Sequence, residues 1–202
     1  MSVTTPQIPS ANGEPTWEAA YMLPVQGSWS EADFLKFHTN RMAELVDGRL
    51  EILPMPTLKH QRILRWLLGI FEAAAPAGSI TLFAPLPTRL FPGTIREPDL
   101  LYIAAENAPG PEVDYPSHLD LALEIVSPGK DARQRDYEDK RTDYARAGIS
   151  EYWIVDPQEK QVTVLVLQDG AYVEHGLFRI GETASGLLLP LLRVDVDGML
   201  NA

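Results

Sequence analysis

The segment LALEIV at residues 121–126 is apolar except for Glu124. A short apolar run of this kind is typical of a strand that is buried on both faces of a sheet. A polar amphipathic segment follows at 133–147, ends at Gly148, and precedes a second strand-like run at 151–156. This order of strand, helix and strand predicts a crossover between two strands of one sheet. It therefore predicts an α/β or α+β domain with a central mixed sheet.

Capping and turn residues delimit the other predicted elements. Ser30 is suited to cap the start of a helix, and a longer helix is expected from about 57 to 75, where apolar residues recur at helical spacing. Asp47-Gly48 and Asp169-Gly170 each separate two strand-like runs, which predicts two β-hairpins. Prolines within 79–91 indicate strands that lie at a sheet edge or are interrupted.

The length of 202 residues is expected to give one domain. Residues 1–28, rich in Pro, Thr, Ser and Gly, are interpreted as a mobile N-terminal arm that packs partly through Trp17, Tyr21 and Met22, and 29–202 as the domain. The chain has no cysteine, which excludes disulfides, thiolate zinc sites and cysteine nucleophiles and fits a reducing cytoplasm. No apolar run is long enough to span a bilayer and no signal peptide is recognisable, so no membrane association is expected.

The formal net charge of −11 argues against a general affinity for nucleic acid. Proteins that bind DNA phosphates usually carry a basic patch, so a nucleic-acid function here would need local clusters, metal ions or a partner. Lys130, Arg133 and Arg135 form the best local candidate for phosphate contact. Acidic residues are interleaved with these and later basic residues, which equally fits a solvated helix face with i,i+4 ion pairs.

Three carboxylates stand at or near the ends of predicted strands. Asp99 opens the run DLLYI, Glu124 lies inside its apolar strand, and Glu44 precedes the first hairpin turn. Carboxylates that converge from adjacent strands suit Mg²⁺, which prefers one or two protein carboxylates together with water and phosphate oxygens. Such an ion polarises a phosphodiester and activates an attacking water.

Each of these carboxylates also has a purely structural interpretation. Asp99 would then be a turn residue after Pro98. Glu124 would lie at an edge position or in a buried salt bridge, and this structural interpretation is weaker than for Asp99 because its flanking residues leave few exposed faces. Glu44 would be an exposed hairpin carboxylate opposite Glu51.

Lys140 shares one face of the predicted helix with Tyr137 and Tyr144, three residues before it and four after it. If the tyrosine face packs on the sheet, the lysine stem covers apolar surface and its ammonium lies near the strand ends. The ammonium would then meet Glu124 or a phosphate. The alternative is an ordinary surface pair with Asp136 at i−4.

Three segments together carry a resemblance to a known family: AELVDGRLEILPMPTLKH, REPDLLYI and LALEIVSPGKDARQRDYEDKRTDYARAGISEYWIVDP. They resemble the Uma2 family, also called DUF820, which is assigned to the PD-(D/E)XK nuclease superfamily. The resemblance implies a restriction-endonuclease-like fold, with a central mixed β-sheet flanked by helices. It also implies a Mg²⁺- or Mn²⁺-dependent endonuclease acting on DNA, for which a homodimer that cuts two strands is plausible.

The resemblance also implies roles for individual residues. Asp99 and Glu124 would bind the metal together with the backbone carbonyl of Ile125, and Glu44 would complete the acidic cluster or orient a water. Val126 stands where the superfamily places a strand lysine. Lys140 matches a lysine that Uma2-like sequences carry on the following helix, where it would stabilise developing charge or orient the attacking water.

His60, the last of these positions, matches a histidine of the family and could contact phosphate or metal. Capping or packing at the start of a helix is an equally good interpretation of this residue.

Two other functions are compatible with the sequence. A catalytically inactive nuclease-fold binding or interaction module is favoured by the net charge and by Val126. A carbohydrate hydrolase would need two carboxylates in a cleft with aromatic platforms. Trp66 and Trp153 lie in apolar stretches and are expected in the core, so this third interpretation is the weakest.

Overall fold

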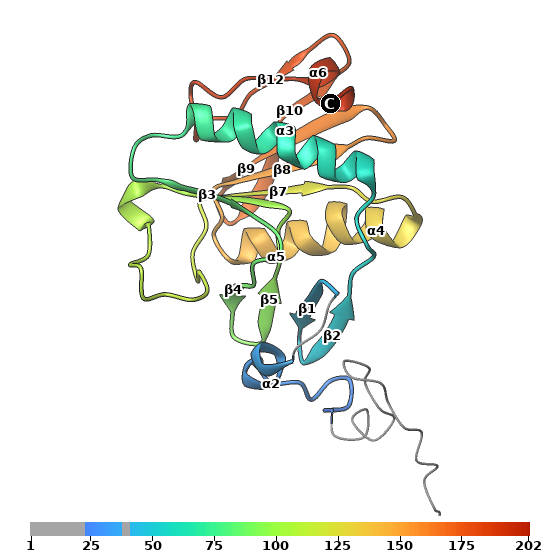
Figure 1. Cartoon of the computed structure of the whole chain (residues 1–202), viewed down its shortest axis with the longest axis vertical. Helices are drawn as coiled ribbons and strands as arrows, with labels where there is room; N and C mark the ends of the chain where they lie inside the picture. The colour runs from blue at the N-terminus through green and yellow to red at the C-terminus, as the bar shows by residue number, and fades with distance from the viewer. Residues whose placement is uncertain (1–22, 38–40) are drawn as a thin grey trace, which may run out of the picture.

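The computed structural model describes residues 23–37 and 41–202, and a six-stranded sheet lies at its centre (Figure 1). The strand order is β10-β9-β8-β7-β6-β3. Only β7 and β8 pair in parallel, and the other neighbours are antiparallel. The predicted central mixed sheet and its crossover are therefore confirmed. The strands are β3 (Ile80–Phe83), β6 (Leu100–Ile103), β7 (Leu121–Ile125), β8 (Glu151–Asp156), β9 (Gln161–Gln168) and β10 (Ala171–Arg179).

Helices cover both faces of this sheet (Figure 1). On one face, α3 (Leu58–Ala74) and the short α6 (Val196–Leu200) pack against a core that includes Trp153. The other face carries the crossover, made of α4 (Lys130–Gln134), a π-helical segment η2 (Arg135–Asp139) and α5 (Lys140–Arg146). No helix among the described residues is long and apolar enough to cross a membrane.

A second sheet of four strands packs beside the first, in the order β2-β1-β5-β4. Its hairpin has the predicted register, with Glu44 opposite Glu51, and the turn residues Asp47 and Gly48 both have positive φ, at 47° and 72°. A Cβ on Gly48 would lie 2.8 Å from the carbonyl oxygen of Gly27, so the turn requires glycine for space as well as for conformation. The elements here are α2 (Glu31–Lys36), β1 (Ala43–Val46), β2 (Arg49–Ile52), β4 (Thr88–Phe91) and β5 (Thr94–Arg96).

The remaining sequence predictions concern the ends of elements. Ser30 caps α2 in a reciprocal arrangement with Asp33, as expected. The proline-containing stretch forms β3 and β4, which are edge strands of the two sheets. The Gln26 side chain exchanges hydrogen bonds with the backbone of Leu50, so the last residues of the expected arm contact the hairpin. Trp17, Tyr21 and Met22 lie outside the described residues.

The outer parts of the fold are short. A 3₁₀ turn, η1 (Ala105–Asn107), follows β6 and begins the loop that leads to β7. After β10, the two-residue strands β11 (Thr183–Ala184) and β12 (Val194–Asp195) pair with each other. The crossover helix ends before Gly148, whose φ is 77°, as the sequence predicts.

Candidate active site

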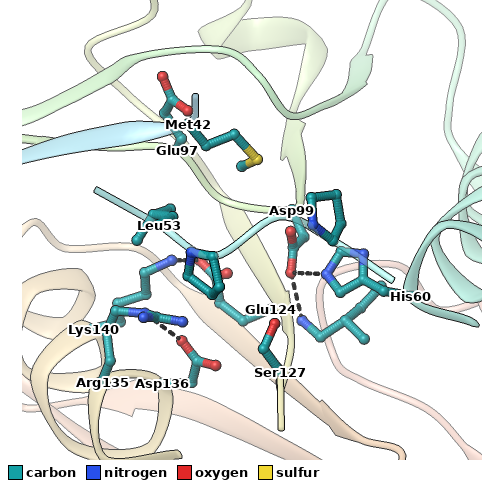
Figure 2. Close-up of a pocket in the computed structure, with 13 residues that line it drawn as sticks. Met42, Leu53, His60, Glu97, Asp99, Glu124, Ser127, Arg135, Asp136 and Lys140 are labelled. Atoms are coloured by element: carbon teal, nitrogen blue, oxygen red, sulfur yellow. Dashed lines mark hydrogen bonds and ion pairs between the residues drawn. The ribbon is translucent and has the colours of Figure 1, made fainter. Parts of the chain in front are cut away.

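Asp99 and Glu124 come from neighbouring strands of the central sheet. Leu100 of β6 pairs with Leu123 of β7, and one further step of this antiparallel register places Asp99 opposite Glu124. Both side chains line the same small pocket, together with His60 and Lys140 (Figure 2). The pocket has a volume of about 30 Å³, which is room for one water molecule or one ion.

Asp99 is held through one carboxylate oxygen. Its Oδ2 accepts hydrogen bonds from the backbone N–H of Ile125 at 2.7 Å and from Nε2 of His60 at 3.1 Å. Because Nε2 faces a carboxylate, we assign its proton to that nitrogen. The other ring nitrogen of His60, Nδ1, is buried and has no hydrogen-bond partner in the described parts of the chain. His60 is therefore both part of the helix start, where Thr57 caps its backbone N–H, and a partner of Asp99.

Glu124 lies in a central strand and is compensated by two donors. Lys140 Nζ is 2.8 Å from its Oε1, and the hydroxyl of Tyr144 donates to the same oxygen at 2.6 Å. The edge-strand alternative is thereby excluded, and a buried ion pair is present. The ion pairs of Lys140 are with Glu124 and, at 3.1 Å, with Glu44, rather than with Asp136.

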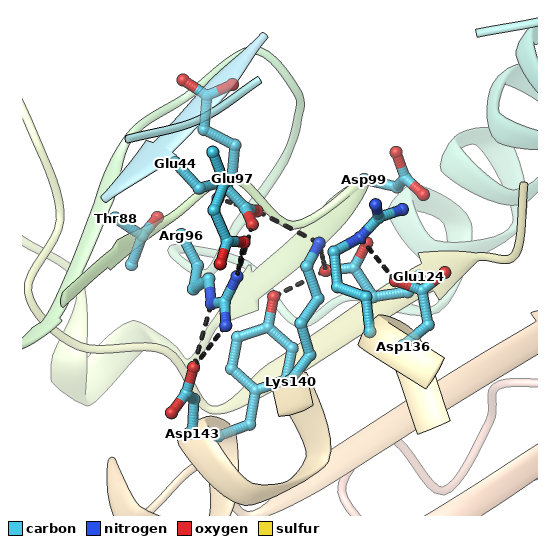
Figure 3. A network of polar contacts seen from close by, with 12 residues as sticks. Glu44, Thr88, Arg96, Glu97, Asp99, Glu124, Asp136, Lys140 and Asp143 are labelled. Atoms are coloured by element: carbon cyan, nitrogen blue, oxygen red, sulfur yellow. Dashed lines mark hydrogen bonds and ion pairs between the residues drawn. The ribbon is translucent and has the colours of Figure 1, made fainter. Parts of the chain in front are cut away.

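Glu44 is fully buried behind Lys140, which excludes the exposed-hairpin alternative. Its Oε1 meets Lys140 Nζ and also accepts from the backbone N–H of Glu97 at 2.9 Å, while its Oε2 accepts from Arg96 at 2.8 Å. Arg96 is 1% exposed and also binds Asp143 (Figure 3). A third ion pair joins Arg96 to Glu51. Glu44 does not line the pocket that Asp99 and Glu124 share, and its contacts position Lys140.

The sequence did not single out Arg96 or Glu97 as members of this cluster, nor Asp136, Asp143 and Tyr144 in these roles. A signal was present for the first two, because Arg96 and Glu97 immediately precede Pro98-Asp99 and continue the short strand β5. Helical spacing placed Tyr144 on the buried face but could not give its partner. Asp136 is 2% exposed, which nothing in its polar surroundings in the sequence indicates.

Burial, together with neighbouring negative charge, shifts the protonation equilibria of the pocket. Burial raises the pKa of Glu124 to about 8, against the attraction of Lys140, and Asp99 and Asp136 push it in the same direction. Burial likewise raises the pKa of Asp136 to about 6. Several carboxylates thus share one ammonium group at the pocket, and an added cation would favour their charged forms.

In Glu44 and Lys140 the surrounding opposite charges outweigh burial and favour the charged forms. Burial disfavours the charged form of Glu44, but Lys140 and Arg96 outweigh it and lower its pKa to about 2. Burial also disfavours the ammonium of Lys140, but Glu124 and Glu44 outweigh it and raise the pKa above its usual value. Lys140 therefore stays charged between Glu44 and Glu124.

The donor set suits a hard cation bound by two carboxylates. Asp99 Oδ1 and Glu124 Oε2 make no hydrogen bond to the described residues, and both side chains line the pocket with Ile125. Within 23–37 and 41–202, no three His, Asp or Glu side chains are arranged to hold a metal ion. Mg²⁺ does not require three, because water and substrate oxygens complete its coordination shell.

The three basic residues within 129–135 have different surroundings in the structure. Arg135 lines the pocket, and it also lines an outer hollow of about 510 Å³ together with Lys130 and Arg41. Arg133 instead binds Asp156 and lies over the ring of Tyr137, 4.6 Å from its centroid. Lys130 and Arg135 are thus placed near the pocket, and Arg133 is engaged elsewhere.

Trp153 lies in the core and Trp66 packs against it, as predicted. Trp153 is fully buried and meets Phe71 edge-on, and Trp66 packs against the same cluster. These two side chains therefore offer no exposed face for stacking on a sugar ring, as the sequence interpretation expected.

Comparisons with known proteins identify the family and the fold. The model of the Uma2 family, described as a putative restriction endonuclease, matches residues 29–197. A crystal structure of a putative nuclease belonging to DUF820 from Anabaena variabilis superposes with a TM-score of 0.71 at 19% sequence identity, covering 85% of this chain and 97% of that one. At this identity the likeness shows the fold. No curated protein matches the chain.

Proposed function

Because the chain belongs to the Uma2 family, we propose that it is a divalent-metal-dependent endonuclease that hydrolyses phosphodiester bonds of DNA. One observation carries the proposal: Asp99 and Glu124, from paired strands, line a single ion-sized pocket with Lys140 beside them. In this proposal Asp99, Glu124 and the carbonyl of Ile125 hold Mg²⁺ or Mn²⁺. When bound, such an ion polarises the phosphodiester and lowers the pKa of an attacking water.

Lys140 takes the part of the missing strand lysine in this mechanism. Its ammonium lies 2.8 Å from Glu124, so it is close enough to the proposed metal ligands to stabilise negative charge on the phosphate or to orient water. Val126, at the expected lysine position, is 2% exposed and belongs to the same helix-facing core as Tyr144. In this proposal the lysine at the strand end therefore comes from the helix, as Lys140, because the position expected for a strand lysine holds the buried Val126.

The other residues position these groups. Glu44 holds Lys140 from behind, and Arg96 fixes Glu44. His60 donates from Nε2 to Asp99 and so helps to orient that carboxylate. A contact between its Nδ1 and a phosphate oxygen would require the doubly protonated imidazolium, because Nδ1 carries no proton in the neutral tautomer. Lys130 and Arg135 would bind the phosphates on either side of the scissile bond.

The proposal is tested by metal binding and cleavage in the wild-type protein. We expect plasmid and single-stranded DNA to be cut when Mg²⁺ or Mn²⁺ is added and to stay intact in EDTA. Calorimetry with Mn²⁺ should give a binding isotherm for the wild type that Glu124→Ala loses. Equal heats in the two proteins, with no cleavage, would favour the alternative of an inactive nuclease-fold module.

Phosphate contact by Lys130 and Arg135 gives a second expected outcome. The double variant Lys130→Ala/Arg135→Ala should bind DNA more weakly and lower the slope of log affinity against log salt by about 1 to 2, because each lost phosphate contact removes about one released counterion. Arg133→Ala is the matched control, since Arg133 is held by Asp156. Fluorescence anisotropy across a salt series measures both, and an unchanged slope in the double variant would remove these residues from the interface.

We also propose a cytoplasmic homodimer. The lack of cysteine fits a reducing compartment, and two copies would place one site on each strand of a duplex. Light scattering of the purified protein measures the oligomeric state directly.

A further inference from the structure

A cleft of about 640 Å³ opens next to the catalytic pocket. It lies between the end of α2 and the loop before β7, and its walls are mostly apolar. Phe37, Met42 and Tyr115 contribute large side chains, and Pro85 and Pro87 contribute rigid ones. The volume falls in the range of sites that hold small organic groups.

The carboxylate of Glu97 lines this cleft and is unusual in lacking a partner. Glu97 is 6% exposed, and its Oε2 is buried without a hydrogen-bond partner among the residues that the structure describes. Its backbone N–H donates to Glu44, so the residue is tied to the network that holds Lys140. Figure 2 shows the Glu97 side chain beside Met42, directed away from Asp99 and Glu124. A buried acceptor without a donor is costly, so we expect a bound group to supply one.

We propose that this cleft binds one unstacked nucleobase of the substrate strand, and that Glu97 accepts hydrogen bonds from N–H donors on the Watson–Crick edge of that base. The proposal rests on the nuclease function above. Aromatic side chains bind unstacked bases through their faces, and enzymes that extrude a base read its Watson–Crick edge. Tyr115 is 41% exposed and so has a free surface for such stacking. Phe37 is braced edge-on against Trp29, with 5.3 Å between ring centroids.

The position of the cleft relative to the other hollows supports this occupant. Glu97 and Met42 line both the cleft and the catalytic pocket, and Arg41 lines both the cleft and the basic hollow of Lys130 and Arg135. A strand whose phosphates lie along the basic hollow would pass the catalytic pocket with a base directed into the cleft. The mostly apolar walls of the cleft disfavour a charged phosphate, so the cleft favours a base over the backbone. Guanine fits best, because its two adjacent N–H donors match the two carboxylate oxygens.

Binding of single-base probes tests the proposal. Each probe is a fluorescent oligonucleotide of abasic spacers that carries one central guanine, one hypoxanthine or no base, titrated in EDTA and followed by anisotropy. For the wild type we expect guanine to bind about tenfold more tightly than no base, and hypoxanthine, which lacks the exocyclic amine, to fall between them. Tyr115→Ala should lose the advantage of a base, and Tyr115→Phe should keep it. Glu97→Gln should make guanine and hypoxanthine equal.

Equal affinity of the wild type for all three probes would overturn the proposal, as would an unchanged preference in Tyr115→Ala. If Glu97→Gln does not fold, as judged by its melting curve, the base preferences of Tyr115→Ala and Tyr115→Phe still test the proposal, because the Tyr115 side chain is exposed. Because binding is measured without metal, the two proposals fail separately. Base preference without cleavage would reject only the nuclease function, and cleavage without base preference would reject only the base-binding cleft.

Discussion

Replacing Asp99 by asparagine or Glu124 by glutamine is expected to lower Mn²⁺-dependent cleavage about a thousandfold while the fold is kept. The two substitutions preserve shape and remove the negative charge that holds the proposed cation. Loss of metal assistance costs several kcal/mol of transition-state stabilisation, and each 1.4 kcal/mol is a factor of ten in rate. The rate of plasmid nicking at fixed Mn²⁺ measures the effect, and thermal melting checks the fold.

A graded series makes this experiment specific to the pocket. Lys140→Met should lower the rate about a hundredfold, the scale of losing one donor to developing charge. It should leave Mn²⁺ binding measurable, because Asp99 and Glu124 remain. Glu138→Gln is the control, since Glu138 is an exposed carboxylate on the same helical run. If Asp99→Asn and Glu124→Gln both cut DNA at the wild-type rate, the assignment of these residues is wrong.

Arg96→Met is expected to give the largest loss of stability, about 3 to 5 kcal/mol in the free energy of unfolding. Arg96 is almost fully buried and binds three carboxylates, so its removal leaves Glu44 buried with one cation fewer. For a chain of this size that is a fall of about 6 to 20 °C in melting temperature. Denaturant unfolding of the variant and the wild type measures it, with the exposed Arg65→Met as control.

The pH dependence separates lost charge pairing from lost packing. The pKa of Glu44 lies at about 2 in the folded protein and near its usual 4.5 in the unfolded chain. Its ionised form therefore stabilises the fold fully above pH 4.5, and this contribution is lost as the pH falls toward 2. Arg96→Met weakens the depression of that pKa, so the stability gap to the wild type should narrow as the pH falls through this window. A gap that is constant with pH would attribute the loss to packing alone.

Much of the local structure could be predicted because its causes are local. Asp47-Gly48 selects a turn with two positive φ angles, and that turn fixes the register of Glu44 against Glu51. Gly148 ends the crossover helix in the left-handed conformation. The apolar run around Glu124 predicts a central strand, since only such a strand is covered on both faces.

The inward orientation of Lys140 could also be predicted from the sequence, because helical spacing places it between two tyrosines. The partners of its ammonium group could not be predicted. Glu124 lies on a strand sixteen residues earlier and Glu44 on a hairpin of the second sheet, and only the packing of the two sheets brings both to the ammonium.

The sequence by itself determined the main strands and helices and the strand–helix–strand crossover, because hydrophobic period and turn chemistry act within a few residues. The pairing of Asp99 with Glu124 at one metal site was implied by the resemblance to the Uma2 family and stays a prediction. The tertiary structure alone decided that Arg96 joins Glu44 to Asp143, that Glu97 lines an apolar cleft, and that Arg133 binds Asp156. Burial and ion pairing depend on which distant segments exclude water around a charge. That is a property of the folded chain and of no single segment.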